Sequence, residues 1–257
     1  MRAVVMRARG GPEVLEVADL PVPEPGPKEV RVRLKAAALN HLDVWVRKGV
    51  ASPKLPLPHV LGADGSGVVD AVGPGVEGFA PGDEVVINPG LSCGRCERCL
   101  AGEDNLCPRY QILGEHRHGT YAEYVVLPEA NLAPKPKSLS FEEAAAIPLT
   151  FLTAWQMVVD KLGVRPGDDV LVMAAGSGVS VAAIQIAKLF GARVIATAGS
   201  EDKLRRAKAL GADERKADIL FRLVRMVMPR DLGDERPFSS LRRAVERGQL
   251  VLHYQPV

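Results

Sequence analysis

Four cysteines, Cys93, Cys96, Cys99 and Cys107, stand within fifteen residues, and they are the only cysteines of the 257-residue chain. Zn²⁺ prefers four tetrahedral ligands, and a Cys-x2-Cys-x2-Cys-x7-Cys loop can surround one ion with thiolates. Disulfides are the alternative, but clustered short spacings in a chain without a secretory signal favour a metal. The spacing therefore predicts one closed structural zinc site. Since all four thiolates would bind the ion, none is left for catalysis.

The composition is that of an ordinary globular protein, with 47% hydrophobic residues, 25% charged residues and a net charge of +2. A balanced charge favours neither nucleic acid nor an acidic membrane surface as a partner. The segment Met1 to Arg7 reaches charge too early for a signal peptide, and the longest apolar run, 179–198, is interrupted by Gln185, Lys188 and Arg193. We therefore expect a cytoplasmic protein with no nucleic-acid or membrane partner.

The elements that must position the cysteines are short β-branched runs separated by Gly and Pro. This pattern covers the first 127 residues and predicts an antiparallel all-β domain, arranged as a small barrel. The zinc loop would be an excursion from that barrel. The predicted strands lie at 3–5, 29–34, 67–72, 83–87 and 121–126.

The pattern changes after Pro136. Ser140-Phe-Glu-Glu143 resembles a capping box that opens a short helix. Buried strands alternating with amphipathic helices then predict a βαβ unit, the opening half of a dinucleotide-binding fold. The later elements are expected at 153–161 (helix), 168–173 (strand), 179–190 (helix), 192–197 (strand) and 200–210 (helix).

The composition changes again at about Glu214, and eight arginines fall between Arg215 and Arg247. Another βαβ unit would require an apolar strand soon after Gly211, whereas 215–228 carries helical spacing, so no third strand is expected. Beyond it we expect a linker, a short helix and a strand, at 229–237, 239–247 and 250–254.

Six stretches, besides the cysteines, carry a family pattern: Pro25-Gly-Pro-Lys-Glu-Val30, Ala38-Leu-Asn-His-Leu-Asp43, Leu61-Gly-Ala-Asp-Gly-Ser-Gly-Val-Val69, Pro81-Gly-Asp-Glu-Val85, Gly119-Thr-Tyr-Ala-Glu-Tyr-Val125 and Gly191-Ala-Arg-Val-Ile-Ala196. Together they make residues 1–213 resemble the medium-chain dehydrogenase/reductase superfamily, in particular zinc-containing alcohol dehydrogenases with quinone-oxidoreductase-like features. The resemblance implies an α/β protein with an all-β part. Its expected domains are a GroES-like β-barrel (1–130) with a zinc lobe at about 90–110, an incomplete Rossmann domain (131–213) and a mostly helical tail (214–257).

The resemblance also implies hydride transfer between NAD(P)H and a small-molecule alcohol, aldehyde or quinone, in a homo-oligomer. In alcohol dehydrogenases of this family, the catalytic zinc is held by a Cys, the His of a Gly-His-Glu motif and a second Cys. The matching positions here carry Asn40, Ala63 and Leu149. We therefore expect one zinc per chain, with no catalytic zinc of the usual kind.

Two interpretations of the neighbouring polar residues remain. A catalytic metal could be rebuilt from His41, Asp43, His59 and Asp64, because imidazole and carboxylate can bind zinc. These groups could instead be polar side chains satisfied inside the barrel, which we favour. The candidate catalytic residues are Asn40, Asp43 and Asp64, and the cofactor would supply the hydride chemistry.

The expected nucleotide loop reads Ala175-Gly-Ser-Gly-Val-Ser180 where a Gly-x-Gly-x-x-Gly fingerprint would stand. Its small residues still permit a pyrophosphate to approach the helix. Ala198 replaces the carboxylate that selects NAD, and the nearby Lys203 favours a 2′-phosphate, hence NADP(H) over NAD(H), unless its side chain merely faces solvent. The candidate cofactor-binding residues are Gly176, Ser177, Gly178, Val179, Ser200 and Lys203.

Residues 241–256 resemble the first helix and strand of EAL-type cyclic-di-GMP phosphodiesterase domains. The segment ends before the Glu-Ala-Leu motif and every metal ligand, so no phosphodiesterase activity follows. Two hypotheses for function result. One is an NADP(H)-dependent oxidoreductase impaired by C-terminal truncation, and the other is a non-catalytic zinc-binding structural or interaction fragment produced by fusion or truncation.

Overall fold

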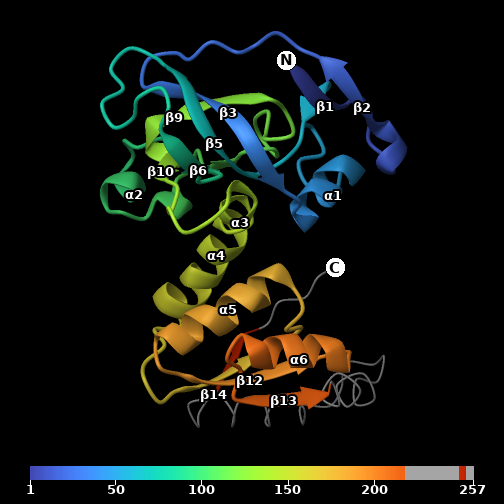
Figure 1. Cartoon of the computed structure of the whole chain (residues 1–257), viewed down its shortest axis with the longest axis vertical. Helices are drawn as coiled ribbons and strands as arrows, with labels where there is room; N and C mark the ends of the chain where they lie inside the picture. Colours follow the sequence, from blue (N-terminus) through green and yellow to red (C-terminus); the bar gives the residue numbers. More distant parts are fainter. Residues whose placement is uncertain (218–248, 253–257) are drawn as a thin grey trace. The chain divides into compact units, whose positions relative to one another are not determined.

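The computed structural model describes residues 1–217 and 249–252, and for 215–217 and 249–252 it describes the backbone alone. The chain divides into two compact units, Met1–Leu149 and Thr150–Val257 (Figure 1). The division lies after the boundary expected at residue 130, because α3 (Phe141–Ala145) packs against the strands of the first unit. The Ser66 hydroxyl of β5 donates to the Phe141 carbonyl at 2.5 Å.

The first unit is built on antiparallel sheets. The largest has the order β10-β6-β5-β3-β9, and a second has the order β2-β1-β4. Within residues 1–149, β9 and β10 are edge strands of the larger sheet, and an isolated bridge pairs Ala3 of β1 with Ala122, which precedes β9. The sheets therefore do not close into the predicted barrel. The strands are β1 (Arg2–Met6), β2 (Leu15–Asp19), β3 (Glu29–Ala38), β4 (His59–Val60), β5 (Asp64–Val72), β6 (Glu84–Ile87), β7 (Gly90–Leu91), β8 (Gln111–Ile112), β9 (Tyr124–Pro128) and β10 (Leu132–Pro134).

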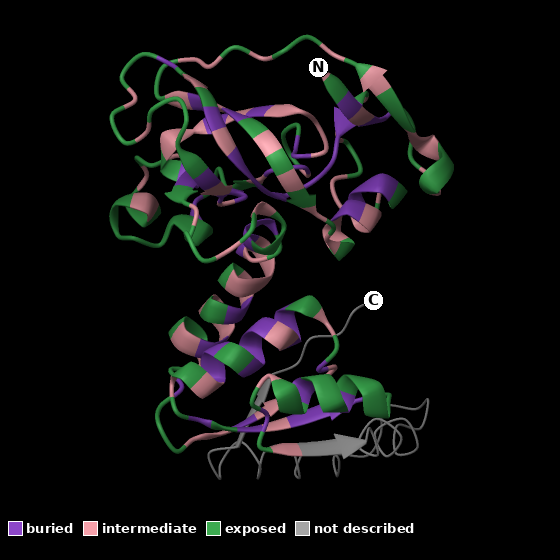
Figure 2. Cartoon of the chain, viewed as in Figure 1, coloured by how far each residue is buried: buried purple, intermediate pink, exposed green. Residues whose placement is uncertain are grey.

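Alternation along β3 and β9 forms the core of this unit. Val30 and Val32 are fully buried, and so is Leu127, while Arg31 and Val126 on the opposite face are only partly buried. Figure 2 shows buried and less buried positions alternating along these strands. The helices of the unit are short: α1 (His41–Lys48), α2 (Glu97–Leu100), α3, and the 3-10 turns Pro12–Val14, Asp104–Leu106 and Glu129–Asn131. Ser140 caps α3 as its sequence predicts, since its hydroxyl accepts from Glu143 N and Glu143 bonds back to Ser140 N.

The second unit contains the predicted βαβ unit. The strands β11 (Asp169–Val172) and β12 (Arg193–Ala198) are parallel, and α5 (Gly178–Leu189) connects them. α6 (Glu201–Ala209) follows, and Figure 1 shows α5 and α6 on the same face of the sheet. α4 (Pro148–Trp155) continues as a π-helix, Gln156–Lys161. Small residues such as Ala182, Ala183 and Ala187 let α5 pack closely on the strands.

The expectation that no third strand follows Gly211 is wrong. β13 (Glu214–Ala217) pairs in parallel with β12, and β14 (Gln249–Leu252) pairs in parallel with β11, which gives the order β13-β12-β11-β14. A short strand at the edge of a sheet is held by backbone pairing and tolerates a polar sequence such as Glu-Arg-Lys, so an apolar run was too strict a criterion. β14 overlaps the strand predicted at 250–254. The helical spacing assigned to 215–228 is therefore wrong for 215–217, which belong to β13. The rest of that segment, the predicted linker, the helix at 239–247 and most of the EAL-like segment lie outside the described residues.

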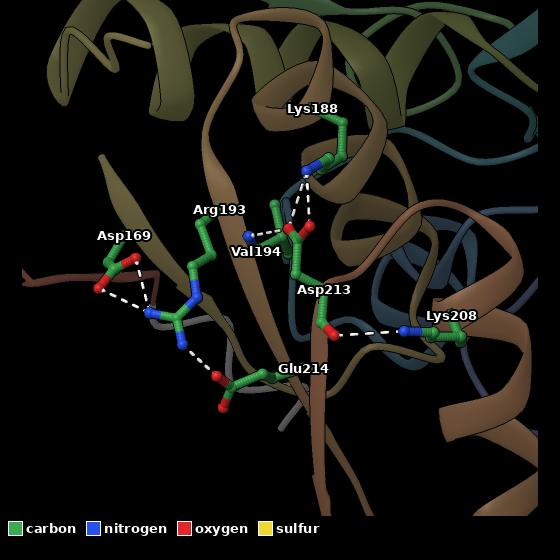
Figure 3. A network of polar contacts seen from close by, with 7 residues as sticks. All are labelled: Asp169, Lys188, Arg193, Val194, Lys208, Asp213 and Glu214. Atoms are coloured by element: carbon green, nitrogen blue, oxygen red, sulfur yellow. Dashed lines mark hydrogen bonds and ion pairs between the residues drawn. The ribbon is translucent and has the colours of Figure 1, made fainter. Parts of the chain in front are cut away.

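A polar network links the amino ends of these strands (Figure 3). Arg193 bonds both Asp169 oxygens at 3.1 Å and pairs with Glu214. Asp213 accepts from the Lys188 ammonium at 2.8 Å and from Val194 N at 2.7 Å. Ligands of open parallel sheets bind at the carboxyl ends of the strands, so this network has a structural role. No helix in the described part of the chain is long and apolar enough to cross a membrane.

Candidate functional site

The four cysteine thiols converge in the lobe formed by residues 93–107. Their sulfur atoms all lie within 4.8 Å of one another. Cys96 Sγ is 3.4 Å from Cys99 Sγ and 3.8 Å from Cys107 Sγ, and Cys93 Sγ is 3.9 Å from Cys99 Sγ. A tetrahedron of thiolates with zinc–sulfur bonds of about 2.3 Å has edges of about 3.8 Å. The thiols therefore fit a tetrahedral zinc ion without rearrangement.

The surroundings of the lobe shift the pKa values of its thiols in opposite directions. The pKa of Cys96 is raised to about 11, against the bond from the Cys99 backbone, by burial and by hydrogen bonds with the other thiols. A hydrogen bond with the Arg95 backbone lowers the pKa of Cys93 to about 5. The Arg109 backbone N–H donates to Cys107 Sγ at 3.3 Å. The pKa of the Arg109 guanidinium is raised by its hydrogen bond to Cys93, so a fixed cation stands beside the sulfur cluster. Such outer hydrogen bonds orient thiolate ligands around an ion.

The candidate catalytic residues Asn40, Asp43 and Asp64 lie in one connected network. Asn40 Nδ2 donates to Asp64 Oδ2 at 2.9 Å, and Asn40 N donates to Asp43 Oδ2 at 2.7 Å. The Tyr121 hydroxyl also donates to Asp43 Oδ2 at 2.7 Å. The Leu149 N–H donates to Asp64 Oδ1 at 3.0 Å, so both oxygens of Asp64 have protein donors. The network orients the Asn40 amide at the start of α1.

Burial dominates the electrostatics of this network. Asp64 is fully buried, and this raises its pKa to about 6, although the bonds from Asn40 and Leu149 oppose the shift. Burial also raises the pKa of Asp43, against the bonds from Asn40, Tyr121 and Gly62. The pKa of Tyr121 is raised by burial and by its bond to Asp43, so Tyr121 keeps its proton and acts as a hydrogen-bond donor to that carboxylate.

The alternative metal set does not assemble. Among the described residues, the four cysteines form the only group of three or more His, Cys, Asp or Glu side chains with metal-binding spacing. His59 Nε2 lies 3.0 Å from the Gly114 carbonyl, and His41 packs on Trp45. His41, Asp43, His59 and Asp64 are thus engaged by protein groups.

The candidate cofactor residues gather around the turn between β11 and α5. Ser177 caps α5, and its hydroxyl accepts from Ser180 N at 3.3 Å. A Cβ added at Gly178 would lie 2.9 Å from Thr150 Cγ2, so a side chain there would meet α4. Val179 is buried in the first turn of α5. The first N–H groups of α5, those of Gly178 and Val179, thus lie in a turn of small residues. Such a turn suits a phosphate.

Ser200 and Lys203 lie beside this turn, at the start of α6. Ser200 caps α6 by accepting from Lys203 N at 3.4 Å. The Lys203 side chain extends across Gly176, where an added Cβ would lie 2.7 Å from Lys203 Cδ. The structure therefore brings the candidate cofactor residues of α5 and α6 together.

Two features of these sites were missed from the sequence. Tyr121 is 78 residues from Asp43, and no local pattern indicates their contact. Ala174 adopts a left-handed backbone conformation with φ of 51°, which favours glycine. It stands one residue before the expected fingerprint, and its position two residues after the end of β11 was the available signal.

Comparisons with known proteins identify the family of the chain. Residues 26–137 match the family described as alcohol dehydrogenase GroES-like domain, and residues 178–215 match the family described as zinc-binding dehydrogenase. A zinc-type alcohol dehydrogenase-like protein of Schizosaccharomyces pombe is 40% identical over 215 residues, which are 82% of this chain and 60% of that protein. Alcohol dehydrogenase 1 of Emericella nidulans is 31% identical and covers 97% of this chain, which spans 75% of that protein.

A crystal structure of an NAD-dependent alcohol dehydrogenase is 97% identical, with a TM-score of 0.84. The match covers 85% of this chain and 64% of that one, so the chain spans less than two thirds of that relative and of the S. pombe protein. The first family match includes the cysteine lobe, and the second begins at Gly178, the first residue of α5. The chain belongs to the medium-chain dehydrogenase/reductase superfamily.

Proposed function

We propose that the chain forms part of an oxidoreductase that transfers hydride between a nicotinamide cofactor and a small-molecule alcohol, aldehyde or quinone. The observation that carries the proposal is the β11–α5–β12 unit, whose glycine-containing turn opens a helix at the carboxyl end of a parallel strand. Membership of the family supports the same reaction. When bound, the nicotinamide cofactor supplies the hydride chemistry.

The proposed cofactor site lies at the amino end of α5. The pyrophosphate would accept hydrogen bonds from the free N–H groups of the first turn and would be stabilised by the positive end of the helix dipole. Gly176 and Gly178 allow the backbone to approach the phosphates, while Ser177 keeps the turn in place through its bond to Ser180 N. Substituting Gly178 with Val should abolish binding, because the new side chain would meet Thr150.

We infer a preference for NADP(H) from the position of Lys203, which lies beside Gly176 and brings a cation to the end of β12. The 97% identical relative is described as NAD-dependent, which supports NAD(H) instead. Titration of both cofactors decides between them. A 2′-phosphate bound by Lys203 predicts roughly tenfold tighter binding of NADPH, lost in Lys203→Gln, because a charge-assisted hydrogen bond contributes about 1.5 kcal/mol or more. Equal affinities, or tighter binding of NADH, would refute the preference.

In the first unit we propose that Asn40 contacts the substrate oxygen, while Asp43 and Asp64 position it. The buried Asp64 carboxylate holds Asn40 Nδ2, and Asp43 holds the Asn40 backbone N–H. Asn40→Ala should therefore lower kcat/KM without changing cofactor affinity. Asn40→Asp, which keeps the shape and loses the N–H donors, distinguishes hydrogen bonding from packing.

The zinc lobe has a structural role in this proposal, with one ion per chain bound by Cys93, Cys96, Cys99 and Cys107. Elemental analysis of the purified chain tests this, and two ions per chain would contradict it. We also propose a cytoplasmic location and homo-oligomeric assembly, and sedimentation velocity measures the second.

The other function is a zinc-stabilised structural or interaction fragment without catalysis. It is favoured by the cysteine lobe, whose four sulfur atoms converge within the first unit and need no cofactor. Titration with NADPH and NADH, followed by the fluorescence of Trp45 and Trp155, separates the two functions. Saturable binding supports the oxidoreductase, and no saturable change at millimolar cofactor leaves the structural function.

A further inference from the structure

The start of α1 carries one polar amide among apolar and aromatic side chains. Leu39, which follows β3 directly, is 86% exposed. Asn40 is partly exposed, and the exposed His41 packs edge to face on the half-buried Trp45, with ring centroids 5.0 Å apart and planes at 68°. Since residues four apart lie on one face of a helix, the two rings form a continuous aromatic surface along α1. We call Leu39, Asn40, His41 and Trp45 the α1 face.

The Asn40 amide on this face has a fixed orientation. One N–H of Nδ2 donates to the fully buried Asp64 carboxylate at 2.9 Å. The Asn40 backbone is held as well, because its N–H donates to Asp43 Oδ2 at 2.7 Å and its carbonyl accepts from Asp43 N at 3.1 Å. An amide has two N–H donors, so the second N–H is left for an acceptor outside the protein.

The orientation of the Asn40 amide depends on the Asp64 carboxylate, whose burial costs free energy. Removing a carboxylate from water costs free energy unless its oxygens are hydrogen-bonded, and here the two oxygens are used by Asn40 and by Leu149 N. A surface asparagine needs no such support to contact water. The buried partner therefore indicates that the direction of the outward N–H matters for binding.

We propose that the α1 face selects substrates in which an aromatic or conjugated planar group adjoins the reacting hydroxyl or carbonyl. The inference deepens the proposed function and rests on it. The Asn40 N–H would donate to the substrate oxygen, and the planar group would pack on Leu39 and Trp45. Aromatic rings gain edge and face contacts that an aliphatic group of the same size lacks.

Benzyl alcohol and cyclohexylmethanol test the inference because they match in size and differ in aromaticity. Their dissociation constants can be measured on the whole chain from the NMR shift of the Trp45 indole N–H, assigned with Trp155→Phe. We expect benzyl alcohol to bind about fivefold more tightly, as expected for one aromatic contact. Trp45→Phe should keep this ratio, and Trp45→Leu should bring it to about one, as read from the shifts of neighbouring backbone amides. Trp155→Phe lies in the other unit and should leave the ratio unchanged.

Equal affinities for the two alcohols, or an unchanged ratio in Trp45→Leu, would overturn the inference. Thermal unfolding of Trp45→Leu checks that the variant folds, and the ratio of the two affinities in the unaltered chain provides the test if it does not. Cofactor titration of the same samples separates this inference from the proposed function. A chain that binds NAD(P)H and does not distinguish the alcohols refutes the substrate class alone, whereas a chain that binds no cofactor refutes the oxidoreductase itself.

Discussion

The buried carboxylate of Asp64 should make the chain less stable as the pH rises from about 4 to about 6. Its pKa is raised from 3.8 to about 6 by burial, so the folded state binds the proton more tightly than the unfolded state. The stabilisation that protonated Asp64 provides is therefore fully present below the unfolded pKa. It is lost as the pH rises through the folded pKa. A shift of about two pKa units corresponds to roughly 3 kcal/mol.

Asp64→Asn removes this charge and keeps a similar shape. The new amide oxygen can accept from Leu149 N, and its NH₂ group can face Asn40 once the Asn40 amide turns over. Neutral hydrogen bonds are weaker than those to a carboxylate, which offsets part of the gain. We therefore expect Asp64→Asn to be more stable than the wild type by about 1 to 2 kcal/mol at pH 8, and to lose that advantage near pH 4.

Urea unfolding followed by circular dichroism, at several pH values between 4 and 8, measures this difference. At each pH, the unfolding free energy of the wild type is subtracted from that of Asp64→Asn. The contributions of titrating groups that both proteins share then cancel. Asp70→Asn is the control, because Asp70 lies on the same strand, is exposed, and pairs with Arg31 at the surface. A difference between wild type and Asp64→Asn that does not vary with pH, or a variant less stable at pH 8, would refute the reasoning.

Three further substitutions probe the remaining features. Cys93→Ser should release zinc and lower the Tm while leaving cofactor affinity intact, and elemental analysis with zinc still bound would contradict the assignment. Ala174→Gly should raise the free energy of unfolding by about 0.5 to 1 kcal/mol, because φ of 51° disfavours a side chain, and urea unfolding would show a loss instead if the turn were unstrained. Asp213→Asn should cost about 1 kcal/mol at pH 7, since it weakens bonds to Lys188 and Val194 N at a partly exposed site. Because the Lys188 bond lowers the pKa of Asp213, that cost should shrink as the pH falls, and a constant cost would exclude the ion pair.

The elements of the second unit were largely predictable because each carries a local signal. Apolar runs mark β11 and β12, and Ser177 and Ser200 cap the helices that follow. β13 was missed because its pairing partner, rather than its own polarity, makes it a strand.

The candidate sites likewise include residues that a local pattern predicted and contacts that it did not. Four cysteines closely spaced in sequence predict their own convergence, and the structure brings their sulfurs within 4.8 Å. The contact between Tyr121 and Asp43, by contrast, depends on the packing of segments 78 residues apart. The open sheets of the first unit were not predictable for the same reason, since closure depends on strand pairing and not on strand pattern.

Nicotinamide cofactor binding at the α5 turn is the central claim, and titration of the chain with NADPH and NADH, followed by tryptophan fluorescence, tests it most directly. The account predicts a saturable change for at least one cofactor, abolished in a folded Gly178→Val variant whose side chain would meet Thr150. No saturable change up to millimolar cofactor, or unaltered binding by Gly178→Val, would contradict it.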